Sequence, residues 1–136
     1  MRRHRVEYDG ALFHVIQRSN NREKIFGSDF DKKRLIDLTA GCISKLGFRL
    51  FGYAIMDNHY HLLLQTGSIP LNKVMHRINY LYSMYYNRSN DRHGHVFGGR
   101  YKAALIQDES YLFAVLRYIH QNPVQAGICK SVSGYC

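Results

Sequence analysis

The sequence predicts an α+β domain in which an antiparallel sheet of four to five strands is covered by helices, as in ferredoxin-like and RRM-like folds. Three observations lead to this class. Strand-like and helical patterns follow one another in the order β-α-β-β-α-β-α. A two-residue turn joins the second and third strand segments, which predicts an antiparallel pair. The chain has 136 residues, two prolines and no linker-like stretch, which predicts one domain over residues 1–136.

Four segments have the composition of strands. Residues 11–18 are rich in β-formers and lie between Asp9-Gly10 and a Ser-Asn-Asn turn. Residues 48–56 and 59–65 are separated by the turn dipeptide Asp57-Asn58, and residues 100–107 form the last segment. The close spacing of the middle two predicts a hairpin.

Three segments have helical periodicity. The first follows Ser28, a good N-cap, and stops at Gly47. The second covers residues 71–87, where apolar side chains recur every three or four positions. The third runs over residues 110–122, with Asp108 as its cap, and ends before a proline.

The charge indicates a polyanionic partner. The chain carries 19 Lys and Arg against 10 Asp and Glu, a net charge of +9, and nucleic acid is the simplest partner for such a domain. No apolar run reaches membrane-spanning length, so we expect no membrane partner. Cys42, Cys129 and Cys136 follow no zinc or disulfide spacing, which predicts a reducing, cytoplasmic compartment. With nucleic acid as its expected partner, we expect the protein to be associated with a bacterial nucleoid.

His59 and His61 are the candidate metal ligands. They begin the third strand segment, and alternate residues of a strand point to the same face, so both imidazoles lie side by side at the mouth of a hairpin. A His-x-His pattern is weak evidence alone, and His93 and His95 form a second one in a glycine-rich loop. We expect the first pair to be the functional one, because a strand holds its side chains more rigidly than such a loop.

The last helix can complete this site. Tyr118 and Asn122 are one turn apart, so they lie on the same side of the helix. If the helix packs on the sheet beside the histidines, His59, His61 and Asn122 become three ligands of an open metal site, with Tyr118 above it. Imidazole and oxygen ligands suit Mn²⁺ or Zn²⁺, and Mg²⁺ if phosphate oxygens complete the shell.

A phenol beside a metal in a basic protein suggests attack on a phosphodiester. A covalent phosphotyrosine would retain the energy of the broken bond, so the strand could be rejoined without ATP. Basic residues that could hold phosphates lie in two groups, Arg18, Arg22 and Lys24 after the first strand, and Arg100 and Lys102 beside glycines.

The chain resembles the HUH superfamily of single-tyrosine transposases, and most of all the REP-associated tyrosine transposases. Four segments carry the resemblance: residues 18–26, residues 56–64 with His59-Tyr60-His61, residues 94–103, and residues 117–127 with Tyr118-Ile119-His120-Gln121-Asn122-Pro123. Their order and spacing match over nearly the whole chain. Tyr60 departs from the pattern, since the middle residue of the motif is usually aliphatic.

This resemblance implies an HUH fold, a divalent cofactor (Mg²⁺ or Mn²⁺) held by His59, His61 and Asn122, and Tyr118 as the nucleophile. The implied substrate is single-stranded DNA with hairpin-forming palindromic ends. The implied reaction is cleavage to a 5′-phosphotyrosine and a free 3′-hydroxyl, followed by rejoining. Relatives of this kind work as monomers or as dimers, so a homodimer is compatible with the resemblance.

Two other functions are compatible with the residues alone. An RRM-like module could hold single strands by stacking bases on Phe13, Tyr53 or Phe97, without a metal. A metal-dependent phosphodiesterase could instead use an activated water, and it would never trap protein on DNA.

Overall fold

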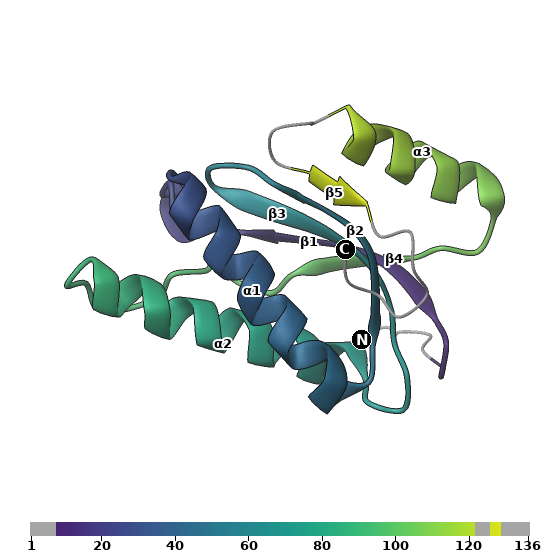
Figure 1. The fold of residues 1–136 in the computed structure, drawn as a ribbon, viewed down its shortest axis with the longest axis horizontal. Helices are drawn as coiled ribbons and strands as arrows, with labels where there is room; N and C mark the ends of the chain where they lie inside the picture. The colour runs from purple at the N-terminus through teal and green to yellow at the C-terminus, as the bar shows by residue number, and fades with distance from the viewer. Residues whose placement is uncertain (1–7, 122–125, 129–136) are drawn as a thin grey trace, which may run out of the picture.

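The computed structural model describes residues 8–121 and 126–128 (Figure 1). Their elements follow in the order β1 (Leu12–Arg18), a short 3₁₀ turn η1 (Asn20–Arg22), α1 (Asp29–Leu46), β2 (Arg49–Ile55), β3 (His59–Gln65), α2 (Leu71–Ser89), β4 (Lys102–Leu105), α3 (Glu109–His120) and β5 (Ala126–Ile128). None of the helices in this described part is long and apolar enough to cross a membrane.

The five strands form one antiparallel sheet in the order β4-β1-β3-β2-β5. Figure 1 shows α1 and α2 together on one face and α3 on the other. The predicted α+β class is therefore confirmed, as is the hairpin of β2 and β3. The sequence did not predict β5, because three residues are too few for an alternating pattern, and this strand depends on pairing with the edge of β2.

The helix ends follow from local chemistry. The Ser28 hydroxyl accepts a hydrogen bond from the Asp31 amide at 3.0 Å, and Gly47 ends α1 in the left-handed conformation with φ of 64°. The Asp108 carboxylate accepts from the Tyr111 amide at 2.8 Å and so starts α3. These caps are the ones that the sequence predicts.

The alternation of side chains along β1 and β3 divides the interior into two cores. The larger core lies under α1 and α2 and includes Phe13, Val15, Tyr60, Leu62 and Leu64. The smaller core lies under α3 and consists mainly of Ala54, Leu63, Ile106, Val115 and Ile119. Because alternate residues change faces, the histidines of β1 and β3 belong to the side that α3 covers.

The segment after α2 is attached to the end of β1. The Gly98 amide donates to the Arg18 carbonyl at 3.0 Å, and the Asn20 amide donates to the Val96 carbonyl at 2.9 Å. A Cβ atom on Gly98 would lie only 2.8 Å from the Ser19 carbonyl oxygen, so no larger residue fits without moving backbone.

We expect Gly98→Ala to destabilise the domain by about 1–3 kcal/mol, because the substitution separates two backbone segments that are held by hydrogen bonds. Urea unfolding measures this change. Gly41→Ala is the matched control, since a Cβ at this helical position of α1 meets nothing within 4 Å, and it should stabilise by about 0.5–1 kcal/mol. Equal stability of the two variants would contradict the close packing of Gly98.

Candidate functional site

The pairing of β1 with β3 positions the two histidines of the site. Arg18 lies opposite His59, and Ile16 lies opposite His61. The side chains of Arg18, His59 and His61 therefore share the face that α3 covers. The two imidazole rings are 5.2 Å apart between centroids and are inclined at 66°. His61 is buried, with 8% of its surface exposed, whereas His59 is partly exposed. The predicted side-by-side arrangement of the pair is therefore what the sheet produces.

Each imidazole is oriented by a second side chain. Asn58 Oδ1 lies 2.8 Å from His59 Nδ1, and His14 Nε2 lies 3.0 Å from His61 Nδ1. Both contacts use Nδ1, so Nε2 is the atom that each ring presents to the site. The sequence alone gave His14 only the role of a strand histidine with a hydrogen-bond partner. Its partner is one of the candidate ligands.

Tyr118 lies directly against His61. Its hydroxyl is 3.4 Å from His61 Nε2, and the ring centroids are 5.0 Å apart. The helix holds it there because Val115 and Ile119, on the same helix, are buried against the sheet. Tyr118 is 39% exposed, so its phenol can be reached from solvent. The expectation that the last helix brings a tyrosine to the histidines is met by these distances.

A second tyrosine of α3 extends the contacts. Tyr111 lies seven positions before Tyr118 on the same side of the helix, and its hydroxyl is 3.2 Å from His14 Nδ1. Tyr111, His14, His61 and Tyr118 thus form a continuous row of polar groups. With neutral rings, one consistent arrangement has His61 Nδ1–H donating to His14, and His14 Nδ1–H donating to Tyr111. This arrangement leaves the lone pair of His61 Nε2 facing Tyr118.

Burial keeps these imidazoles neutral. Burial lowers the pKa of His61 to about 4, with smaller contributions from His14, His59 and Arg18. Burial and then Arg18 lower the pKa of His59, and burial lowers that of His14. Neutral imidazole is the form that binds metal ions, so the environment favours ligation near pH 7.

The described residues include two candidate ligands of a metal ion, His59 and His61. Within residues 8–121 and 126–128, no three His, Cys, Asp or Glu side chains come together in a way that could hold a metal ion. The two imidazoles present Nε2 atoms on one face, which fits two ligands of a divalent cation. The predicted third ligand, Asn122, lies outside the described residues.

Arg18 and Arg22 line a small pocket beside His59. This pocket has a volume of about 290 Å³ and is completed by Ser19 and Asn58, the residue that orients His59. Asn21 and Arg22 both have positive φ, 54° and 57°, a conformation that costs free energy for residues other than glycine. The Ser19 hydroxyl is buried and has no hydrogen-bond partner among the described residues. The two guanidinium groups are the part of this pocket that would attract a phosphate.

The other predicted phosphate contacts are distributed more widely. Lys102 pairs with Ile16, which pairs with His61, so these residues form one row across the face of the sheet that α3 covers. At about 4.8 Å per strand, Lys102 is two strands, or about 10 Å, from His61. Lys24 is exposed and does not line the pocket of Arg18 and Arg22, and Arg100 lines a separate groove beside α2. Of the five predicted cations, Arg18 and Arg22 thus lie together, and the other three lie apart from them.

The proposed stacking role of Phe13 is wrong. Phe13 lies under α1 and α2 and is 1% exposed, because its position in β1 has the opposite parity to His14. Phe97 packs against Phe26 and Tyr60, and Tyr53 is partly buried against the same core. The face on which an RRM-like module would stack bases is therefore not formed by these three residues.

Tyr60, the unusual middle residue of the His-x-His motif, is accommodated in the core by burial and a hydrogen bond. It is fully buried, and its hydroxyl donates to Asn79 Oδ1 at 2.5 Å. The Asn79 amide in turn donates to Gln17 Oε1 at 2.8 Å. Burial raises the pKa of this phenol far above its usual range, so it remains neutral. Tyr60 therefore acts as a core residue that aligns β3 with α2.

A His-hydrophobic-His strand in an antiparallel sheet, facing a tyrosine on a helix, defines the HUH class of proteins. The chain belongs to the family of IS200-like transposases, whose family model matches residues 7–122. None of the curated proteins matches the chain in sequence.

Among the solved structures of similar fold are two transposases. One is a REP-associated tyrosine transposase bound to a REP hairpin; it has 16% sequence identity and a TM-score of 0.67, covering 91% of this chain and 73% of that one. The other is a candidate transposase from Deinococcus radiodurans R1, with 16% identity and a TM-score of 0.62, covering 90% of this chain and 98% of that one.

Proposed function

We propose that this protein is a metal-dependent DNA strand transferase that cleaves and rejoins single-stranded DNA through a phosphotyrosine on Tyr118. The observation that carries the proposal is the 3.4 Å contact between the Tyr118 hydroxyl and His61 Nε2. A partly exposed phenol beside two neutral imidazoles is an arrangement that catalysis uses and packing does not require.

We assign a divalent cation, Mg²⁺ or Mn²⁺, to His59, His61 and Asn122. When bound, such a cation neutralises charge on the phosphate oxygens and favours in-line attack. His14 and Asn58 would hold the two imidazoles in the orientation that presents Nε2. The low pKa of His61 favours the ligating form over the whole range from pH 5 upward.

In the chemical step, the Tyr118 oxygen forms a bond to phosphorus and loses its proton. The bond between phosphorus and the 3′-oxygen breaks, and that oxygen gains a proton to become a free 3′-hydroxyl. The 5′-phosphate stays on Tyr118. The reverse step, with a 3′-hydroxyl of another strand as the nucleophile, releases Tyr118 and joins the strands without ATP.

Cations around the site would hold the DNA backbone. The pocket lined by Arg18 and Arg22 would hold a phosphate next to the scissile one. Lys102 would contact a strand that crosses the catalytic face, and Lys24 and Arg100 would contact flanking segments. A solved structure of similar fold is bound to a REP hairpin, which supports a hairpin-forming single strand as the substrate.

The test is incubation of the protein with a labelled single-stranded hairpin and Mn²⁺ or Mg²⁺, followed by denaturing electrophoresis. We expect a protein–DNA band that resists denaturation, together with a free 3′-hydroxyl product. Cleavage without such a band would indicate hydrolysis by water. Binding that survives a chelator, without cleavage under any divalent ion, would indicate the RRM-like binding module.

His14 contacts His61, so its removal tests whether the orientation of the His61 ring matters for metal binding. We expect His14→Ala to weaken Mn²⁺ binding by about 10-fold to 100-fold, because His61 loses the group that fixes its ring. Tyr111→Phe removes a contact to His14 and not to His61, so it should reduce the Mn²⁺ affinity less. Isothermal titration with Mn²⁺ measures both.

His93→Ala is the matched control for His14→Ala, because His93 is exposed on a loop. It should leave Mn²⁺ affinity unchanged. Equal Mn²⁺ affinity of His14→Ala and the wild-type protein would remove His14 from the site.

A further inference from the structure

A groove lies between α2 and the segment of residues 94–101, away from the catalytic face. Its volume is about 800 Å³, the size of a ligand-binding cleft. One wall is a stripe of α2 at helical spacing, formed by Lys73, His76, Arg77, Tyr80 and Ser83. The other wall includes His95 and Arg100, and Gln17 and Asn79 also line it.

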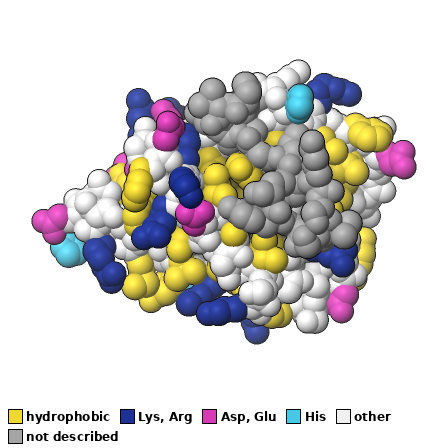
Figure 2. Space-filling model, viewed as in Figure 1, with side chains coloured by type: hydrophobic (Ala, Val, Ile, Leu, Met, Phe, Trp, Pro, Cys, Tyr) yellow, Lys and Arg dark blue, Asp and Glu magenta, His cyan; other side chains and the backbone are white. Residues whose placement is uncertain are grey.

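The charge of this groove has one sign. Lys73, Arg77 and Arg100 line it, and no Asp or Glu is among the described residues that do so. None of these three cations forms a salt bridge in the described part of the chain. Figure 2 shows Lys and Arg side chains along the lower edge of the molecule, on the side where α2 lies in Figure 1. The groove is therefore complementary to a polyanion.

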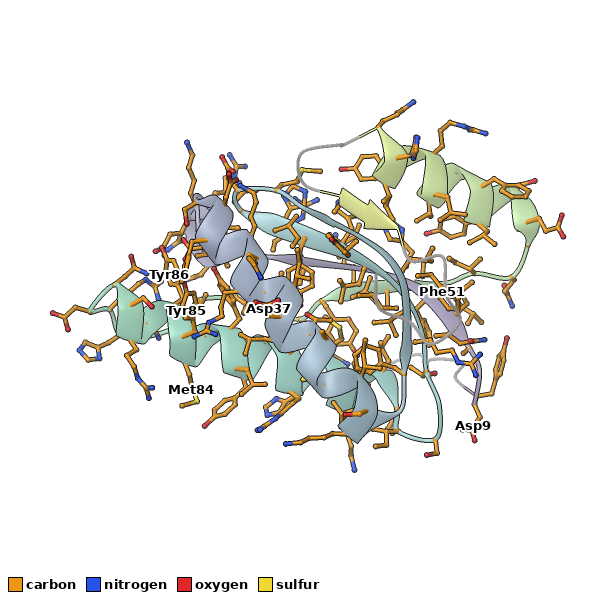
Figure 3. All side chains as sticks on the ribbon, viewed as in Figure 1. Asp9, Asp37, Phe51, Met84, Tyr85 and Tyr86 are labelled. Atoms are coloured by element: carbon orange, nitrogen blue, oxygen red, sulfur yellow. The ribbon has the colours of Figure 1, made fainter. Side chains whose placement is uncertain are left out.

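The groove also presents an aromatic ring. Tyr80 is 48% exposed; His76 stacks near it with an interplanar angle of 12°, and the Arg77 guanidinium lies 5.9 Å from its ring centroid. Met84, one turn further along, is 41% exposed and lies on the side of α2 opposite to Tyr85 and Tyr86 (Figure 3). An exposed tyrosine framed by cations is the platform on which unpaired bases stack.

The groove is connected to the catalytic region. Its loop wall is joined to the end of β1 by the hydrogen bond from Gly98 to Arg18 and by the bridge between Ser19 and Phe97. Arg18 lies opposite His59 across the sheet. The loop wall of the groove is therefore attached to the same end of β1 that carries Arg18.

We propose that the groove is a second binding site for single-stranded DNA, in which Lys73, Arg77 and Arg100 hold phosphates and Tyr80 stacks a base. The proposal rests on the proposed function for the identity of the polyanion. It adds a site on the opposite layer of the fold, which holds the segment of the strand that flanks the cleaved phosphate.

The test measures binding without catalysis. Fluorescence anisotropy with a labelled 20-nucleotide oligo(dT), in EDTA and at several salt concentrations, compares the wild-type chain with Lys73→Ala/Arg77→Ala and with Tyr80→Ala. We expect Tyr80→Ala to weaken binding by about 5-fold to 100-fold. The double variant should reduce the slope of log K against log salt by about 0.7 for each phosphate contact removed.

Arg88→Ala is the matched control, because Arg88 is an exposed cation of α2 that does not line the groove. It should bind oligo(dT) like the wild-type chain. Circular dichroism melts check that all variants fold, which is expected because the substituted side chains are exposed.

Two results would overturn the proposal. One is unchanged affinity for oligo(dT) in both groove variants. The other is a loss confined to a 20-base-pair duplex, which would assign the groove to double-stranded DNA. Neither result involves the covalent adduct, so a failure of the groove and a failure of the Tyr118 mechanism are separately visible.

Discussion

Tyr118→Phe is expected to abolish the covalent protein–DNA adduct and strand cleavage, while DNA affinity stays within about twofold of the wild-type value. The substitution removes only the oxygen that lies 3.4 Å from His61 Nε2 and leaves the ring in place. Loss of a nucleophile typically costs about 10³-fold or more in rate. Denaturing electrophoresis measures the adduct, and fluorescence anisotropy measures binding.

Tyr8→Phe is the control for this substitution. Tyr8 is 55% exposed and lies outside the site, so removal of its hydroxyl should leave the adduct unchanged. If Tyr118→Phe formed the adduct at the wild-type rate, Tyr118 would not be the nucleophile, and another of the eleven tyrosines would have to be sought.

His59→Ala and His61→Ala are expected to reduce cleavage by about 10³-fold or more, because each removes one of the imidazoles assigned to the divalent cation. Mn²⁺ binding should fall with them, as measured by titration calorimetry. DNA binding in EDTA should persist, since the basic residues remain. For the wild-type chain, EDTA should stop cleavage and added Mn²⁺ should restore it.

His61→Gln separates this effect from a loss of stability. His61 is buried and hydrogen-bonded to His14, so alanine there leaves His14 Nε2 without its partner. Glutamine keeps a polar group, and His93→Ala, at an exposed loop histidine that does not line the groove, serves as the matched control. Full cleavage by His59→Ala, or cleavage unaffected by EDTA, would contradict the assignment of a metal.

Local features of the sequence were enough to predict the helix ends and the β2–β3 hairpin. The caps at Ser28 and Asp108 and the stop at Gly47 set the helix ends, and the Asp57-Asn58 turn set the hairpin. These features act over a few residues, so no tertiary information is needed to find them. Strand β3 has the predicted bounds, His59–Gln65, for the same reason. The short β5 was missed because only its neighbour β2 makes it a strand.

The role of His14 depends on the tertiary structure. Its local context is an ordinary strand, and nothing within ten residues identifies its partner. The register that sets Ile16 opposite His61 also brings His14 diagonally next to that ring, and the docking of α3 brings Tyr111 to its other nitrogen. The one signal in the sequence was that His14 is a polar residue within the otherwise apolar residues 11–16.

The sequence by itself determined the order of the elements, the shared face of His59 and His61, the basic character of the chain and its resemblance to single-tyrosine transposases. Those properties are fixed by backbone periodicity, turn chemistry and composition, which are local. The tertiary structure alone decided that Tyr118 contacts His61, that Phe13 lies in the core, and that α2 forms one wall of a basic groove. These facts depend on strand register and on which face of the sheet each helix covers, and both are settled by burying apolar surface across the whole domain.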